Sequence, residues 1–138
     1  MDPYLLTQQF IDSADPDCVA WLMGRAGSKQ TYHDNTSDFD NWKLVPRMMT
    51  GVKSVNPSVE FQLGESSFRW ETPFAVAPVG VQGRVTTTGD LVAAAGAASV
   101  GVPFIVSSVS SKSLEDIAKV IKMTNPNAPA PWFQLYNR

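Results

Sequence analysis

In the second half of the chain, short apolar runs alternate with longer stretches that have a helical pattern. The runs over 74–77, 102–106 and 132–136 are mostly apolar, which is typical of strands covered on both faces in a parallel sheet. Between them, residues 90–100 are rich in alanine and residues 113–123 begin with a capping-box pattern, so both predict helices. Such alternation predicts parallel pairing through right-handed crossovers.

The first half of the chain lacks this alternation. Helices are expected over 16–23 and 31–42, followed by an extended segment around Pro46, because proline disfavours a helix at the residue before it. Two short strands over 59–63 and 67–70 flank a Gly-Glu pair and predict a β-hairpin.

Two architectures contain strands and helices in this order. A doubly wound sheet that binds a dinucleotide should carry G-x-G-x-x-G after its first strand, and the segment PVGVQGR over 78–84 does not match. A (β/α)8 barrel places functional groups at the C-terminal ends of its strands. Here those ends carry glycine or polar residues, namely Gly80, Ser107, Ser108, Gln134 and Tyr136.

We therefore predict an α/β fold that is the N-terminal part of a TIM (β/α)8 barrel, with about three strands, preceded by helices and a β-hairpin. A complete barrel takes about 250 residues, and this chain has 138. The expected organisation is a single incomplete domain over 1–138. The N-terminal helices and hairpin occupy 1–72, and the first barrel strands and helices occupy 73–138.

Composition and charge exclude several classes of function. Hydrophobic residues make up 43% and charged residues 17%, which is typical of a globular protein. The net charge is -2 and no run of Lys or Arg occurs, so we expect no nucleic-acid partner and no membrane partner. No apolar run approaches the roughly 20 residues of a membrane span.

The content of cysteine and histidine argues against a metal site. The single cysteine, Cys18, allows no internal disulfide and fits a reducing compartment. The chain has a single histidine, His33, which argues against a histidine-based metal site. The N-terminus also lacks the basic and apolar regions of a secretory signal, so we expect a cytoplasmic protein.

Several short segments occur in an order and spacing that resemble one family. They are GRAG over 24–27, Thr31 with Asn35 and Phe39, WKLVPRMM over 42–49, PFAVAPVGV over 73–81, GD over 89–90, GVP over 101–103, Ser107 and Ser108, SLEDI over 113–117, and FQLY over 133–136. The chain resembles the FMN-dependent α-hydroxy-acid oxidases and dehydrogenases, which include glycolate oxidase, lactate oxidase and lactate monooxygenase. The resemblance extends from about residue 19 to the last residue.

This resemblance implies FMN as cofactor, a small 2-hydroxy acid as substrate, and hydride transfer from the substrate α-carbon to the flavin. It also implies a homo-oligomer for the full-length family protein. The residues that it implies beside the flavin are the backbone groups of Pro78, Val79 and Gly80 and the side chains of Ser108, Gln134 and Tyr136. Tyr136 faces the substrate as well and is the catalytic residue that the resemblance assigns.

Trp21 departs from the family pattern, and the residue type at position 80 differs between two branches of the family. Trp21 stands where family members have a tyrosine that binds the substrate carboxylate, and an indole N–H can donate a hydrogen bond but cannot accept one. We expect Trp21 and Tyr136 to be the substrate-binding residues. Gly80 is glycine in the lactate monooxygenase branch and usually alanine in the oxidases, which favours the monooxygenase-like branch.

In the family, the catalytic histidine, the substrate-binding arginines, a lysine and the phosphate loop come from later strands, and none of them maps onto this chain. Without a base, oxidation of the substrate loses about 10²- to 10⁴-fold of general catalysis.

Two hypotheses follow: the chain is the N-terminal part of a flavin-dependent oxidoreductase, or it is a catalytically inactive half-barrel that acts as an interaction or regulatory partner. A third, a phosphate-binding barrel without flavin, is disfavoured by the QLY and APVG segments.

Overall fold

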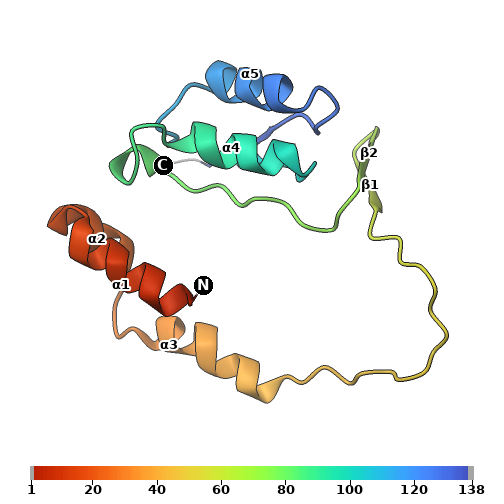
Figure 1. Ribbon diagram of the computed structural model, residues 1–138, viewed down its shortest axis with the longest axis horizontal. Coiled ribbons are helices and arrows are strands. Elements are labelled where there is room, and N and C mark those ends of the chain that lie inside the picture. Colours follow the sequence, from red (N-terminus) through yellow and green to blue (C-terminus); the bar gives the residue numbers. More distant parts are fainter. Residues whose placement is uncertain (1, 137–138) are drawn as a thin grey trace. The chain divides into compact units, whose positions relative to one another are not determined.

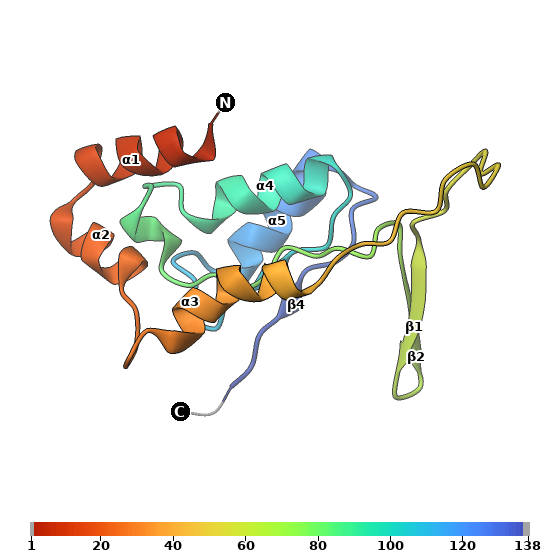
Figure 2. The same ribbon diagram turned by 90° about the horizontal axis from the view of Figure 1, so that it is seen from below.

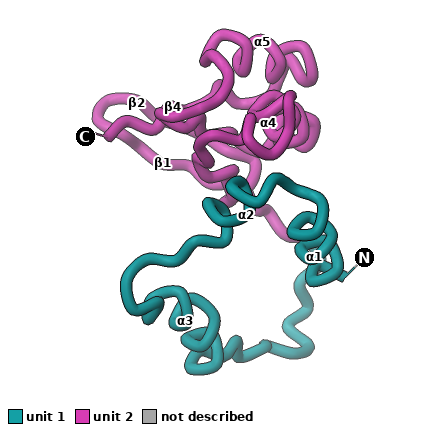
Figure 3. The backbone as a smooth tube through the Cα atoms, turned by 90° about the vertical axis from the view of Figure 1, so that its left-hand side faces the viewer, with its two compact units in different colours: residues 1–54 teal, residues 55–138 magenta. Residues whose placement is uncertain are grey.

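The computed structural model describes residues 2–136. Contacts within the chain divide it into two compact units, residues 1–54 and residues 55–138 (Figure 3). None of the helices in the described residues has the length and apolar content of a membrane span.

The first unit consists of short helices. They are α1 (Pro3–Ser13), α2 (Pro16–Met23) and α3 (Gln30–Ser37), and α3 continues into the 3-10 helix η1 (Asp38–Asn41) (Figure 1). The prediction over 16–23 is confirmed, and the helix predicted over 31–42 divides into α3 and η1. Residues 42–58 contain no helix or strand, as expected around Pro46.

Helix α1 was not predicted, although its start follows ordinary capping rules. The side chain of Asp2 accepts a hydrogen bond from the backbone N–H of Tyr4 at 2.9 Å, and Pro3 occupies the first turn. Helix α2 begins in the same way, with Asp15 as the cap and Pro16 in the first turn. The Asp-Pro dipeptide was therefore a signal that sequence analysis could have used.

The second unit begins with the predicted hairpin. Strand β1 (Val59–Leu63) pairs antiparallel with β2 (Ser66–Trp70), with Val59 opposite Trp70 and Leu63 opposite Ser66. Gly64 takes a positive φ of 59° in the turn, which glycine adopts without strain.

Three parallel segments follow the hairpin. Strand β3 (Ile105–Val106) pairs with β4 (Trp132–Phe133), and on its other side Phe104 forms a parallel bridge with Val76. Backbone bonds join the three segments, including Val76 N–H to the Pro103 carbonyl at 2.8 Å and Gln134 N–H to the Val106 carbonyl at 2.9 Å. The ladders are shorter than the predicted runs, but their order along the sheet matches an open section of a barrel.

Helices α4 (Asp90–Ser99) and α5 (Leu114–Thr124) connect these strands and pack together (Figures 1 and 2). Ser113 caps α5 by accepting a hydrogen bond from the Asp116 N–H at 3.1 Å, which confirms the predicted capping box start. The buried core lies between the helices and the strands and consists of Ala94, Ala97, Ala98, Phe104, Val106, Ile117 and Ile121. Small side chains on α4 allow this close packing.

The expectation that the first strand is covered on both faces is wrong for the described residues. Val76 packs against the core, whereas the next residue, Ala77, is exposed. Successive residues of a strand point to opposite faces, and the helices of this unit cover only one of them. The uncovered face is the one that a complete barrel would enclose.

Candidate functional site

The C-terminal ends of the three parallel segments meet at one edge of the sheet. Gly80 follows the first segment, Ser107 and Ser108 follow β3, and Gln134 follows β4. Parallel strands place these ends together, which is where barrel enzymes bind their substrates. The structure therefore brings together four of the residues that the strand-end pattern predicts.

Gln134 is the centre of this cluster. Its side-chain carbonyl oxygen lies 3.4 Å from the Ser107 hydroxyl, 3.4 Å from the Ser108 backbone N–H and 3.4 Å from the Ser108 hydroxyl. A backbone N–H can only donate, so the atom that faces Ser108 is the oxygen of the amide. The amide nitrogen of Gln134 then remains available, since it has no hydrogen-bond acceptor among the described residues.

Ser107 has a role in the site that sequence analysis did not predict. It is only 4% exposed, it donates toward Gln134, and its hydroxyl accepts a hydrogen bond from the Val109 N–H at 3.2 Å. Ser107 therefore orients Gln134, while the half-buried Ser108 is the more accessible of the two serines. The alternation of faces along β3 was the signal that could have separated their roles.

Gly80 is a site of close approach between two loops. A Cβ atom at this position would lie 2.4 Å from Cγ2 of Val109 and 3.3 Å from the Ser107 hydroxyl oxygen. The position accepts no side chain unless Val109 moves. The glycine thus serves the packing of the strand-end loops and is not merely a turn residue.

The remaining predicted site residues are more exposed. Pro78 is half-buried and Val79 is 51% exposed, both beside Gly80. Tyr136, at the end of the described residues, is 45% exposed. Trp21 lies on α2 in the first unit and is 48% exposed, so the structure describes it separately from the strand-end cluster.

Arg25, in the first unit, is engaged locally. Its guanidinium lies 3.9 Å from the centroid of the Tyr32 ring, and it also donates to the Tyr32 hydroxyl and to the Met23 carbonyl, each at 2.7 Å. These contacts fix the segment between α2 and α3, and they favour a structural role for Arg25 within this unit.

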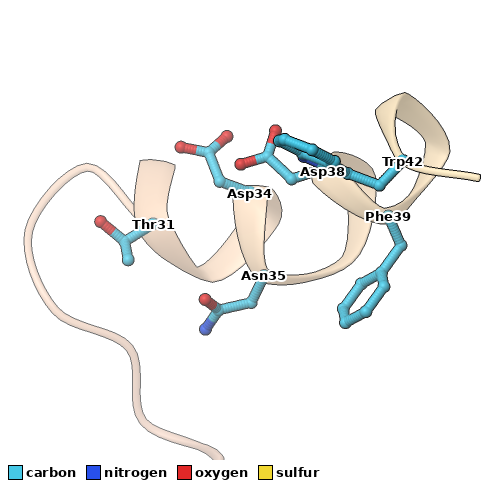
Figure 4. Close-up of a pocket in the computed structure, with 6 residues that line it drawn as sticks. All are labelled: Thr31, Asp34, Asn35, Asp38, Phe39 and Trp42. Carbon is cyan, nitrogen blue, oxygen red and sulfur yellow. The ribbon is translucent and has the colours of Figure 1, made fainter.

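A hollow on the first unit is lined by residues from α3 and η1 (Figure 4), with a volume of about 510 Å³: Thr31, Asp34, Asn35, Asp38, Phe39 and Trp42. Its two carboxylates bond to neighbours on the same segment, Asp34 to Gln30 and Asp38 to Asn41. Within residues 2–136, no group of three or more His, Cys, Asp or Glu side chains could hold a metal ion. The hollow thus has no donor set for metal chemistry.

The strand-end cluster fits the rim of a flavin ring, which carries carbonyl oxygens and ring nitrogens. The amide nitrogen of Gln134 is a suitable donor, and the Ser108 hydroxyl, whose single hydrogen is directed to Gln134, is a suitable acceptor. The missing side chain at Gly80 lets the first loop pack closely beside them. These polar groups and the exposed backbone of this edge are therefore compatible with a planar, polar-edged cofactor.

Three parallel segments, helices on one face and a polar cluster at the strand ends define an open section of an α/β barrel. The chain belongs to the FMN-dependent dehydrogenase family, whose sequence profile matches residues 12–138. This membership confirms the predicted family and fold class.

Known relatives are about three times longer than the chain. An L-lactate oxidase from Lysinibacillus sphaericus is 36% identical over 116 residues, which are 84% of this chain and 28% of the relative. The FMN-dependent alpha-hydroxy acid dehydrogenase qulF from Penicillium citrinum is 33% identical over 135 residues, which are 98% of this chain and 31% of the relative.

Solved structures show the same partial coverage. The structure of a mandelate oxidase with (S)-4-hydroxymandelic acid superposes with a TM-score of 0.75 at 29% identity and covers 95% of this chain and 34% of that one. A mutant of an (S)-mandelate dehydrogenase superposes with a TM-score of 0.71 at 26% identity and covers 94% of this chain and 34% of that one. The chain thus spans about a third of the structures that it matches.

Proposed function

We propose that the chain forms the first strands of the flavin site in an FMN-dependent oxidoreductase that acts on a small 2-hydroxy acid. The observation that carries this proposal is the convergence of Gly80, Ser108 and Gln134 at one sheet edge, with a donor of Gln134 left available. Membership of the family supplies the cofactor class. Relatives named for L-lactate and mandelate support the substrate class.

The chain's residues would bind and orient the cofactor. Backbone groups of Pro78, Val79 and Gly80 would lie along the flavin, with the Gln134 amide as a side-chain donor and the Ser108 hydroxyl as a side-chain contact. When bound, FMN supplies the hydride acceptor that no amino-acid side chain provides. Because Ser107 and Ser108 engage the carbonyl oxygen of Gln134, the amide nitrogen would be the group that binds the flavin.

Two aromatic residues would contact the substrate. Tyr136 would face both flavin and substrate, and its hydroxyl can donate and accept hydrogen bonds. Trp21 would donate its indole N–H to the substrate carboxylate. No residue of the chain is proposed as the base that takes the hydroxyl proton, so we expect no turnover of lactate, glycolate or mandelate by the 138-residue chain alone.

The test is an FMN titration of the ¹⁵N-labelled chain followed by NMR. We expect weak binding, with chemical-shift changes that concentrate on the amides of residues 78–81, Ser108 and Gln134 and spare the hairpin. Inorganic phosphate is the control ligand, because it lacks the ring. Shifts confined to the hairpin, or identical shifts with phosphate, would contradict the flavin site.

A flavin-reduction assay tests the second part of the proposal. The purified chain, supplied with FMN and lactate under anaerobic conditions, should leave the flavin absorbance unbleached, because no residue of the chain is assigned as the general base. Sustained bleaching by homogeneous material would show that the chain contains a base that we have not assigned.

One observation favours a second candidate, a half-barrel that binds a protein partner. A largely apolar hollow of about 430 Å³ lies beside the first parallel segment, lined in part by Val76, Val79, Val85 and Val92. The outward-facing Phe133 on β4 is 51% exposed. Unpaired strand edges with apolar surroundings favour association with another chain.

A further inference from the structure

A buried carboxylate, that of Asp90, lies at the first residue of α4. Asp90 is 1% exposed, and its Oδ2 accepts a hydrogen bond from the backbone N–H of Ser111 at 3.0 Å. Its Oδ1 is buried and has no hydrogen-bond partner among the described residues. A buried carboxylate with an unmatched oxygen costs free energy that an apolar residue would avoid. A purely structural role in packing therefore does not explain why an acid stands here.

Ser111 extends this contact to the loop after the first strand. Its hydroxyl accepts a hydrogen bond from the backbone N–H of Gly83 at 2.8 Å. A Cβ atom at Gly83 would lie 2.9 Å from both Cβ and Oγ of Ser111, so the backbone and the serine are in direct contact. Gly83 belongs to the 3-10 turn η2 (Gln82–Arg84), which follows Gly80 closely in the chain.

The same loop is held at a second point. The backbone N–H of Val81 donates to the Val109 carbonyl at 3.0 Å. Val81 has a φ of 54°, a strained conformation for a β-branched residue, which persists only where surrounding contacts enforce it. The loop over residues 80–84 is thus clamped to the loop over 107–111 by Val81 on Val109 and by Gly83 on Ser111.

We infer that Asp90 is a positioning residue: through Ser111 it holds the 80–84 loop in place and thereby sets the backbone of Val79 and Gly80. Its carboxylate suits this role because an ionised acceptor makes a stronger hydrogen bond to an N–H group than a neutral one. It also lies in the first turn of α4, where negative charge is favoured. The link to flavin rests on the proposed function, whereas the chain of hydrogen bonds does not.

Amide hydrogen exchange of the 138-residue chain, measured by NMR, tests this order of contacts. Replacing the acid (Asp90→Ala) should accelerate exchange at the amides of both Ser111 and Gly83, roughly tenfold or more. Ser111→Ala should accelerate exchange at Gly83 alone, since the Ser111 position keeps its backbone bond to Asp90. Asp90→Asn should fall between wild type and Asp90→Ala, because it retains a neutral acceptor.

The matched control is Asp116→Asn. Asp116 also lies in the first turn of a helix, α5, but it is exposed, so its replacement should leave exchange at Gly83 unchanged. Equal acceleration at the core amides of Val106 and Ile117 in Asp90→Ala would mean that Asp90 merely stabilises the fold. Unchanged exchange at Gly83 in that variant would mean that the Asp90–Ser111 contact does not hold the 80–84 loop in place. Either result overturns the inference.

Adding FMN separates this inference from the proposed function. In wild type, FMN should slow exchange at the amides of residues 79–81, and Asp90→Ala should reduce that protection several-fold. Protection that is equal in the two proteins would overturn the link between Asp90 and the flavin-facing backbone. If FMN leaves amide exchange of the wild-type chain unchanged, that result contradicts the proposed function. Exchange at Gly83 would still decide whether Asp90 positions the loop.

Discussion

The two ends of the parallel strands in the second unit carry different kinds of side chain, aromatic at the start and polar at the end. The segment over 132–134, which includes β4, shows both. At its start, Trp132 packs against the hairpin, with ring centroids 5.9 Å from Phe61, 5.2 Å from Phe68 and 5.4 Å from Trp70. Two residues later, Gln134 is surrounded by serine donors, each at 3.4 Å. Residues two apart on a strand share a face, so the change happens along one surface.

This difference separates stability from binding. Aromatic rings at such distances pack closely and contribute both buried area and favourable edge-to-face contacts. Hydrogen bonds of 3.4 Å are long and hold a polar group without satisfying it fully. In barrel folds, the start of the strands serves stability and the end serves function. We therefore expect substitutions at the two ends to affect different properties.

The largest effect should come from the aromatic end. Trp132→Ala removes the ring that joins the hairpin to the parallel strands and should lower the free energy of unfolding by about 2–4 kcal/mol, below the value for a fully buried tryptophan because Trp132 is half-buried. Urea unfolding measures the change. Gln134→Ala is the control on the same strand, and it should cost less than about 1 kcal/mol. Equal losses in the two variants would remove the contrast between the ends.

The next largest effect on stability tests the close packing of Gly80 against Val109. Gly80→Ala places a methyl group 2.4 Å from Cγ2 of Val109 and should cost about 1–3 kcal/mol of stability through overpacking. Adding Val109→Ala to that variant should recover much of the loss. A double-mutant cycle measures the coupling. Additive effects would mean that the two residues do not compete for the same space.

A smaller effect should come from a cap near the polar end. Ser113→Ala removes the hydrogen bond to the Asp116 N–H and should lower the free energy of unfolding by about 1 kcal/mol. FMN binding should stay as it is, because this serine caps α5 and is not among the proposed flavin contacts. Ser113→Asp, which keeps an acceptor, should restore the stability in the same urea experiment. A weaker FMN response in Ser113→Ala would extend the binding site to this loop.

The smallest effect should come from the ion pairs of the hairpin. Arg69 bonds to Glu60 at 2.8 Å and to Glu71 at 2.9 Å, but all three side chains are exposed. Hydrogen bonds to Glu71 and Glu60 raise the pKa of Arg69. Arg69→Gln should leave the urea midpoint nearly unchanged, with no dependence on salt. A clear drop would show that charge as well as aromatic packing stabilises this end.

Local patterns predicted much of this fold. The hairpin turn, the helix over 16–23 and the Ser113 cap follow from signals that neighbouring residues supply, and the structure confirms them. The predicted strands were too long, because the length of a ladder depends on partners that lie far away in the sequence. Helix α1 was missed because the Asp-Pro start of that segment was not weighed.

The candidate site could be predicted only in part. The rule that parallel strands end at one edge of the sheet predicted that Gly80, Ser108 and Gln134 lie together, and the structure has them there. The rule could not show that Ser107 orients Gln134, because that requires knowing which face each serine takes. The bond from Asp90 to Ser111 joins residues 21 positions apart in sequence, and no local pattern marks it. The assignment of individual residues to flavin and substrate stays a prediction.

The most direct test is the thermal unfolding midpoint with and without FMN, measured for wild type, a Trp132→Phe variant and Gln134→Ala. A ligand that binds the folded state raises the midpoint by an amount set by its concentration and dissociation constant. We predict that millimolar FMN raises it in wild type and in Trp132→Phe but not in Gln134→Ala. An equal rise in all three proteins would place flavin binding away from the polar strand ends and contradict the account.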